Sequence, residues 1–345
     1  MVAKPTKKVE KLKFCIYEKE GEIARIIYNR PEKLNAYNIM GVPEGVMTDM
    51  TNLLSDAEVD DDIKVVIIKG NGRCFSTGMD LADAGFTVGY KDGKGTEGTK
   101  KANQRLGLRL DSLKHEESLR ILSFPKITIA QVHSYCLGMA THIAAYTDFC
   151  VAGEDAQFGL VYTRMFGDMA SACALPFIYM VGLNRFREMA LTGQTYSAQE
   201  MKEFGLIHKV VPNDRLEAEV EALAQSLTLR PKDGLAIGKY SMRVILQMMG
   251  ITPTYSYWGG LWHRYLTNLK WEEGEYSFLK ERRDKGLKSA LYGMHDRFVD
   301  TPQATLPKTR ADLKKSDIKP YDYDLEAYER KVKEAAAKER KKKLG

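Results

Sequence analysis

The stretch that most constrains the fold runs from Ser123 to Asp148 and reads SFPKITIAQVHSYCLGMATHIAAYTD. A β-branched apolar run is followed by one glycine, Gly138, and then by the small apolar residues typical of a buried helix. This order predicts a buried strand, a turn at Gly138 and a helix that starts directly after it. Backbone N–H groups at a helix start lack intrahelical partners and lie at the positive end of the helix dipole. We therefore expect the amides of Gly138 and Met139 to stabilise a developing oxyanion.

A second apolar run leads into a similar corner. Val65–Gly70 has the composition of a buried strand, and the loop after it turns at Gly78. Asp80 can cap a helix that follows, which leaves the N–H of Met79 free to point at a ligand. Two strand–turn–helix corners can supply two N–H donors to one site.

Five segments carry a resemblance to a known family. They are Asn29–Ala36 (NRPEKLNA), Phe75–Leu81 (FSTGMDL), Lys126–Gly138 (KITIAQVHSYCLG), Asp155–Gly159 (DAQFG) and Leu191–Gly193 (LTG). In order and spacing they resemble the crotonase (enoyl-CoA hydratase/isomerase) superfamily, across residues 14–300. Alternating β and α segments indicate an α/β fold with sheet and helix layers. The resemblance implies a crotonase-type ββα spiral core with a C-terminal helical trimerisation region, and hence a homotrimer or a hexamer.

The chain is expected to divide into four parts. Residues 1–13 are rich in lysine and predicted to be disordered, 14–250 form the spiral core, 251–300 form the C-terminal helical region, and 301–345 form a charged tail beyond the family pattern. Within these parts, 85–104 has no periodicity and is expected to be a loop over the site, and 255–291 is expected to be helical and rich in aromatic residues.

The positive charge is concentrated in the tail, where 13 Lys or Arg and 8 Asp or Glu give a net of +5 of the chain's +6. We expect a solvated or partner-bound extension. Nucleic-acid binding through its Lys/Arg cluster is the alternative, because phosphate contacts need only positive charge. Neither an eighteen-residue apolar run nor a signal-peptide pattern is present, so a cytoplasmic protein that does not enter the membrane is expected.

Metals, disulfides and separate cofactors are not expected. The five cysteines show no CxxC spacing, and no His, Cys and carboxylate cluster has the spacing of metal ligands. The resemblance implies an acyl-CoA thioester substrate, so that coenzyme A is part of the substrate and no cofactor is needed.

The resemblance also assigns the groups that bind the substrate. The oxyanion donors are the amides of Met79 and Met139, which would stabilise a thioester enolate as its charge forms. Most members of the family have glycine at the second position, so the Met139 side chain would narrow the pocket. The backbone from Lys33 to Ala36 lines the coenzyme A site. The residues expected to bind substrate are Lys33, Leu34, Ala36, Ser76, Gly78, Asp80, Gly138 and Arg164.

The acid/base positions depart from the family. Where the hydratases carry two glutamates, this chain has His142 and Tyr162, so the two-carboxylate mechanism does not carry over. His142 lies four residues after Gly138, on the same helix face, where an imidazole can activate water or move a proton. A purely structural histidine is the alternative. Tyr162 can donate a hydrogen bond, shuttle a proton or only pack.

Asp168 is the carboxylate candidate. With one residue deleted in its loop, it aligns with the aspartate of the ring-cleaving and naphthoate-forming crotonases, and Arg164 lies near a lysine of those enzymes. The alternative is a surface ion pair between Asp168 and Arg164.

Four functions are weighed. The first is a hydratase-type lyase that adds water to a bulky or cyclic enoyl-CoA, in the degradation of fatty acids or aromatic compounds. The second is a C–C hydrolase that opens a cyclic oxoacyl-CoA. The third is an enoyl-CoA isomerase, and the fourth is a non-catalytic binding protein that uses the basic tail.

Overall fold

The computed structural model describes residues 7–38, 45–81, 118–166, 174–251 and 271–298, together with residues 105, 116 and 301. All of these belong to one compact unit, Met1–Thr305, while Leu306–Gly345 makes a second unit outside the described residues. The expected loop at 85–104 and, apart from residue 301, the charged tail therefore lie outside the described part of the chain.

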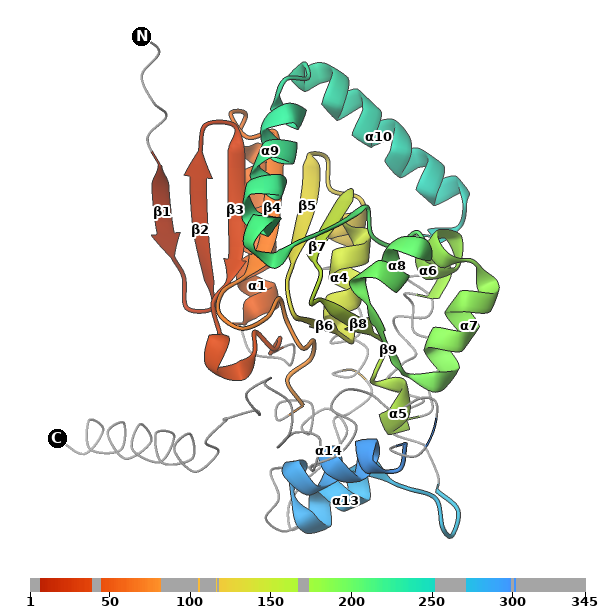
Figure 1. Cartoon of the computed structure of the whole chain (residues 1–345). Coiled ribbons are helices and arrows are strands. Elements are labelled where there is room, and N and C mark those ends of the chain that lie inside the picture. The colour runs from red at the N-terminus through yellow and green to blue at the C-terminus, as the bar shows by residue number, and fades with distance from the viewer. Residues whose placement is uncertain are drawn as a thin grey trace, which may run out of the picture. The chain divides into compact units, whose positions relative to one another are not determined.

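Seven strands form the main sheet, in the order β1-β2-β3-β4-β5-β7-β10 (Figure 1). The first three are antiparallel neighbours, whereas β3, β4, β5, β7 and β10 are parallel. Parallel neighbours need long crossover connections, which the helices supply. The strands are β1 Lys8–Lys11, β2 Cys15–Glu20, β3 Ile23–Tyr28, β4 Val65–Gly70, β5 Ile127–Val132, β7 Phe149–Gly153 and β10 Lys209–Val211.

Both faces of the main sheet are covered, which explains the unbroken apolar runs of the central strands. In β4, Val65 and Ile67 pack with α9 (Leu216–Thr228) on one face. Val66 and Ile68 point to the opposite face and join the larger core, to which α1 (Val46–Val59) and α4 (Met139–Tyr146) contribute. The site helix α4 is therefore buried along its whole length.

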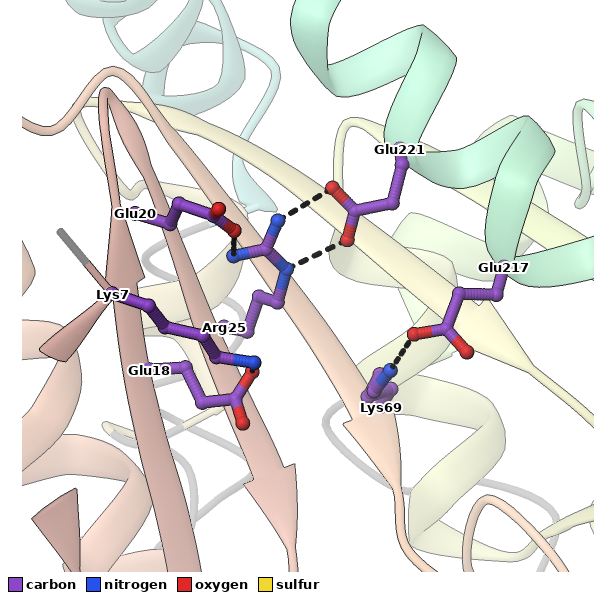
Figure 2. A network of polar contacts seen from close by, with 7 residues as sticks. All are labelled: Lys7, Glu18, Glu20, Arg25, Lys69, Glu217 and Glu221. Carbon is purple, nitrogen blue, oxygen red and sulfur yellow. Dashed lines mark hydrogen bonds and ion pairs between the residues drawn. The ribbon is translucent and has the colours of Figure 1, made fainter. Parts of the chain in front are cut away.

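Ion pairs add to the apolar contacts between α9 and the sheet (Figure 2). Arg25 of β3 forms a bidentate ion pair with Glu221 of α9, in which Nε donates to Oε1 and Nη2 donates to Oε2, both at 2.6 Å. Lys69 of β4 pairs with Glu217, one helical turn earlier, at 2.8 Å. The Arg25 side chain is almost fully buried while Glu217 is mostly exposed, so the first pair is screened far less by water than the second.

A small second sheet has the order β6-β8-β9 and lies next to α4 (Figure 1). Its strands are β6 Tyr135–Leu137, β8 Gln157–Gly159 and β9 Thr195–Ser197. The other helices described before α13 are α5 Thr163–Phe166, α6 Ala174–Val181, α7 Leu183–Thr192, α8 Ala198–Glu203 and α10 Lys232–Met248, with two 3-10 turns at Pro31–Lys33 and Asn213–Arg215. Helix α8 begins with a capping box, in which the Ser197 side chain accepts from the Glu200 N–H and the Glu200 side chain accepts from the Ser197 N–H.

The C-terminal helices pack against the segment around α5. They are α13 (Phe278–Lys285) and α14 (Leu287–Asp296), and they share an apolar cluster with Met165 and the partly buried Tyr162. The predicted helix over 255–291 is wrong for residues 271–277, which are described and have no helical structure. Residues 252–270 lie outside the described part.

One further expectation needs correction at the N-terminus. Residues 1–13 were expected to be disordered, yet Lys8–Lys11 form β1 and pair with β2 in antiparallel register. All four side chains of β1 are exposed, so no apolar pattern signals the strand, and the edge of β2 provides its hydrogen bonds. Among the residues that the structure describes, no helix is both long and apolar enough to cross a lipid bilayer.

Candidate active site

The first corner turns at Gly78 and is held by Tyr37. The Tyr37 N–H donates to the Gly78 carbonyl oxygen at 2.7 Å, and the Asp80 N–H donates to the Tyr37 carbonyl oxygen at 2.9 Å. The N–H of Met79 belongs to the same peptide unit as the Gly78 carbonyl, and in a trans peptide the two point in opposite directions. The Met79 N–H therefore points away from Tyr37, and it has no acceptor within the described chain.

The second corner turns at Gly138. The Gly138 N–H donates to the Gly159 carbonyl oxygen at 2.7 Å, which ties the corner to β8. Met139 is the first residue of α4, and its N–H likewise has no acceptor among the described residues. The Gly138 carbonyl oxygen accepts from Thr141 inside the helix, so the Met139 N–H points out of the helix start.

The two corners touch each other. Gly78 has φ +80°, and a Cβ atom added to it would lie 2.4 Å from the Leu137 carbonyl oxygen and 3.0 Å from the Met139 nitrogen. Glycine is thus required both by the left-handed backbone and by the close approach. The structure brings the predicted donors Met79 and Met139 onto adjacent backbone segments, which is the arrangement that an oxyanion site needs.

The segment from Lys33 to Ala36 is shaped by the buried side chain of Asn35. Leu34 and Asn35 have φ values of 51° and 53°, a left-handed pair that Asn tolerates better than most residues. The Asn35 Nδ2 group donates to the carbonyl oxygens of Asn71 at 2.8 Å and Cys74 at 2.9 Å, while Oδ1 accepts from the Arg30 N–H. This network fixes the predicted coenzyme A loop against the loop that leads to Gly78.

Arg30 connects the same loop to Asp80. Its Nη1 donates to the Ala36 carbonyl oxygen at 2.8 Å, and its Nη2 lies 2.9 Å from Asp80 Oδ2. Both side chains are largely buried, so the carboxylate of Asp80 is engaged with a protein cation. Leu81, directly after Asp80, is helical, and residues 82–104 lie outside the described part of the chain, so the capping role of Asp80 stays a prediction.

His142 lies within a cage of aromatic rings. It is 4% exposed, and its ring centroid lies 5.2 Å from that of Phe177, 6.0 Å from Tyr162 and 6.3 Å from Tyr146. Its Nε2 atom is buried and has no hydrogen-bond partner among the residues that the structure describes. An unpaired buried polar atom costs about 1–3 kcal/mol, so a bound molecule that pairs with Nε2 would recover that free energy.

Tyr162 lies next to both His142 and the second corner. A Cβ atom added at Gly138 would be 3.9 Å from Tyr162 Cδ1. The structure therefore brings together His142, Tyr162 and Gly138, the residues at the two acid/base positions and the donor turn.

Arg164 points from α5 toward the C-terminal helices. It is buried, its Nε donates to the Thr192 carbonyl oxygen at 3.3 Å, and its guanidinium lies 4.4 Å from the centre of the Phe298 ring. Burial lowers the pKa of Arg164 to about 10. Asp168 lies outside the described residues, so its catalytic role and its pairing with Arg164 stay predictions.

Several residues around the site were missed from the sequence. The aromatic neighbour Tyr146 follows His142 by four residues, and that helical spacing could have indicated the contact. Asn35 and Arg30 lie within the matched motif, and the tolerance of Asn for left-handed backbone was a usable signal for Asn35. Phe177 comes from a distant helix and gave no local signal. In the described part of the chain no group of three His, Cys, Asp or Glu side chains could hold a metal ion.

Comparisons with known proteins agree with this geometry. The sequence model of a family described as enoyl-CoA hydratase/isomerase matches residues 18–288. The chain is 27% identical over 265 residues to a putative enoyl-CoA hydratase of Thermus thermophilus, covering 76% of this chain and 96% of the relative. It is 28% identical over 229 residues to the 2,3-dehydroadipyl-CoA hydratase of Escherichia coli, covering 66% of this chain and 81% of the relative.

An isomerase and a solved structure are similar to the chain as well. The 1,2-epoxyphenylacetyl-CoA isomerase of Escherichia coli is 26% identical over 233 residues, covering 67% of this chain and 82% of the relative. The crystal structure of an enoyl-CoA hydratase/isomerase from Xanthobacter autotrophicus Py2 superposes with a TM-score of 0.69 at 25% identity, covering 84% of this chain and 99% of the other. The crotonase-type α/β fold expected from the sequence is thereby confirmed.

Proposed function

Because the chain belongs to the enoyl-CoA hydratase/isomerase family, we propose that it adds water to an enoyl-CoA thioester through an enolate held by the N–H groups of Met79 and Met139. The observation that carries the proposal is the contact between the two corners, each with one backbone N–H that has no acceptor in the described chain. Charge on the thioester oxygen is poorly stabilised in water. One preorganised donor contributes about 100- to 1000-fold in rate.

His142 is the proposed base. Nε2 takes a proton from water as the water oxygen bonds to Cβ of the substrate, and the electron pair of the double bond moves into the enolate. The same proton then returns to Cα, either from the imidazolium or through the Tyr162 hydroxyl. This sequence adds one water and leaves the protein unchanged. The proximity of His142 and Tyr162, with ring centroids 6.0 Å apart, supports a shared task.

The surroundings of His142 favour an apolar acyl group. Phe177, Tyr146 and Tyr162 enclose the imidazole, and the carboxylate of Asp80, beside the Gly78 corner, is paired with Arg30. Aromatic surfaces of this kind pack well against a bulky or cyclic acyl chain. We therefore propose a bulky or cyclic enoyl-CoA as the substrate class.

The other reactions use the same two donors and differ in the bond that breaks. In ring opening of a cyclic oxoacyl-CoA, activated water attacks the ring ketone, the C–C bond breaks and the thioester enolate leaves. For this reaction Asp168 is a second candidate for the base that activates the water. In isomerisation one base moves a proton from one carbon to another without gain of water. Because the chain is similar to both hydratases and an isomerase, one experiment is designed to distinguish hydration, ring opening and isomerisation.

The test is mass spectrometry of straight-chain, aromatic and cyclic enoyl-CoAs and oxoacyl-CoAs after incubation with the protein. Wild type is compared with His142→Ala, Tyr162→Phe and Asp168→Asn. Hydration predicts a gain of one water that His142→Ala abolishes and Tyr162→Phe slows. A new free carboxylate in the product would instead show ring hydrolysis, and a product of unchanged mass would show isomerisation. No turnover of any substrate would contradict the catalytic proposal.

A further inference from the structure

The hydroxyl of Ser76 is enclosed between the predicted coenzyme A loop and the donor corner. Ser76 is 0% exposed. Its Oγ donates to the Asn35 carbonyl oxygen at 2.8 Å and accepts from the Gly78 N–H at 3.0 Å. The sequence motif places Ser76 among the substrate-binding residues, whereas the structure engages its hydroxyl with two protein groups.

Ser76 also joins the two corners through its backbone. Its N–H donates to the Tyr135 carbonyl oxygen at 3.0 Å, and its own carbonyl oxygen accepts from the Leu137 N–H at 3.1 Å. The residue therefore contacts the strand that leads into Gly138 as well as the turn at Gly78. These four hydrogen bonds reach both segments that carry the proposed donors.

The direction of the Met79 N–H depends on how Gly78 is held. The Gly78 N–H is bound by Ser76 Oγ, and the Gly78 carbonyl oxygen is bound by the Tyr37 N–H. With both ends of Gly78 fixed, little rotation is left to the peptide unit that carries the Met79 N–H. Glycine has the widest backbone freedom of all residues, so external bonds must supply this restraint.

We propose that Ser76 is a positioning residue of the oxyanion site, whose hydroxyl aligns the Met79 N–H and links it to the loop containing Asn35. The inference rests on the proposed function, because the alignment matters only if the Met79 N–H binds an enolate oxygen. Loss of the hydroxyl leaves the Asn35 carbonyl and the Gly78 N–H unpaired and frees Gly78 to rotate. A misplacement of about 1 Å at a catalytic group can cost about 100-fold.

The experiment compares the binding of coenzyme A with that of acetoacetyl-CoA, a 3-oxoacyl thioester that readily forms an enolate. Coenzyme A has no thioester oxygen and reports on the nucleotide loop alone. The ultraviolet absorbance of the bound enolate reports on the oxyanion donors. The variants are Ser76→Ala, Ser76→Thr, which restores a hydroxyl, and Ser76→Cys, which keeps a weaker hydrogen-bonding group.

Thr128→Val is the matched control. Thr128 is also 0% exposed, and its Oγ1 donates to Asp148 Oδ2 at 3.1 Å and accepts from the Asp148 N–H at 3.0 Å. This variant loses a buried hydroxyl with one donated and one accepted bond, but in a part of β5 that does not contact either donor corner. It measures the general effect of such a loss on stability and binding.

We expect Ser76→Ala to bind coenzyme A about as tightly as wild type, and acetoacetyl-CoA about tenfold to 100-fold more weakly, with loss of the enolate absorbance. Ser76→Thr should recover most of the enolate absorbance, and Ser76→Cys should give an absorbance between those of Ser76→Ala and Ser76→Thr. If Ser76→Ala does not fold, the comparison of Ser76→Thr with Ser76→Cys still tests whether a stronger hydrogen-bonding group gives a stronger enolate signal. An unchanged ratio of the two affinities in Ser76→Ala, or an equal change in Thr128→Val, would overturn the positioning role. Failure of wild type itself to stabilise the enolate would instead overturn the proposed function.

Discussion

Replacing Gly78 by alanine should disable the site while leaving most of the fold intact. The added Cβ would lie 2.4 Å from the Leu137 carbonyl oxygen and 3.0 Å from the Met139 nitrogen. Backbone at this position cannot yield without moving the corner at Gly138, so the two donors must separate by a substantial fraction of an ångström. Such a displacement, or the loss of one donor, costs about 100-fold or more in rate.

Gly182→Ala separates this effect from backbone strain. Gly182 has φ +77°, close to the +80° of Gly78, but a Cβ there meets nothing within 4 Å. Both substitutions place a side chain on backbone with positive φ, which costs about 1–3 kcal/mol of stability. Only Gly78→Ala should also change the oxyanion site.

The assay is kcat/KM for the acyl-CoA that the mass-spectrometric panel identifies, together with the enolate absorbance of bound acetoacetyl-CoA. Denaturant unfolding gives the stability of each variant. The expected result is destabilisation of both variants, larger in Gly78→Ala because its Cβ also meets the Leu137 carbonyl oxygen, and loss of turnover and of the enolate band in Gly78→Ala alone. If folded Gly78→Ala kept kcat/KM within about threefold of wild type, the donor geometry described above would be refuted.

Two further predictions concern stability. Glu221→Gln should lower the free energy of unfolding by about 2 kcal/mol, because it leaves the buried Arg25 guanidinium without its bidentate carboxylate partner. Glu217→Gln on the same helix removes a more exposed ion pair and should cost less than about 1 kcal/mol. Equal losses of stability in denaturant unfolding would contradict the role of burial. Burial, together with the charge of Arg164, lowers the pKa of His295 to about 4. Protonation therefore favours the unfolded chain, whose His pKa is about 6.5, so stability should fall by about 2 kcal/mol from about pH 7 to about pH 5. His295→Gln should lack that part of the decrease, and identical pH profiles for both proteins would show that His295 titrates normally.

Short-range patterns were enough to predict the framework of the site. The apolar run of β4, the glycine turn at Gly138 and the helix from Met139 all follow from periodicity and turn chemistry, and the structure has each of them. The family and the crotonase-type fold were also predictable, because the motifs occur in order over most of the chain. The position of His142 one helical turn after Gly138, beside Tyr162, followed from helical spacing.

Contacts between distant segments could not be predicted in the same way. Phe177 packs on His142, and Ser76 donates a hydrogen bond to Asn35. In each pair the two residues are about forty positions apart in the sequence, and they meet only because the fold brings their segments together. The strand β1 has only exposed side chains, so its place in the sheet depends on the free edge of β2. The catalytic roles of Met79, Met139, His142 and Tyr162 stay predictions, as does that of Asp168.

The most direct test of the central claim is hydrogen exchange at Cα of a saturated acyl-CoA, a substrate analogue that cannot be hydrated or opened. The protein is incubated with butyryl-CoA and phenylacetyl-CoA in deuterium oxide, and deuterium in the acyl group is measured by mass spectrometry. If His142 removes the Cα proton while Met79 and Met139 hold the enolate oxygen, wild type should incorporate deuterium, and both His142→Ala and Gly78→Ala should abolish it. Incorporation that survives both substitutions, or its absence in wild type, would contradict the account.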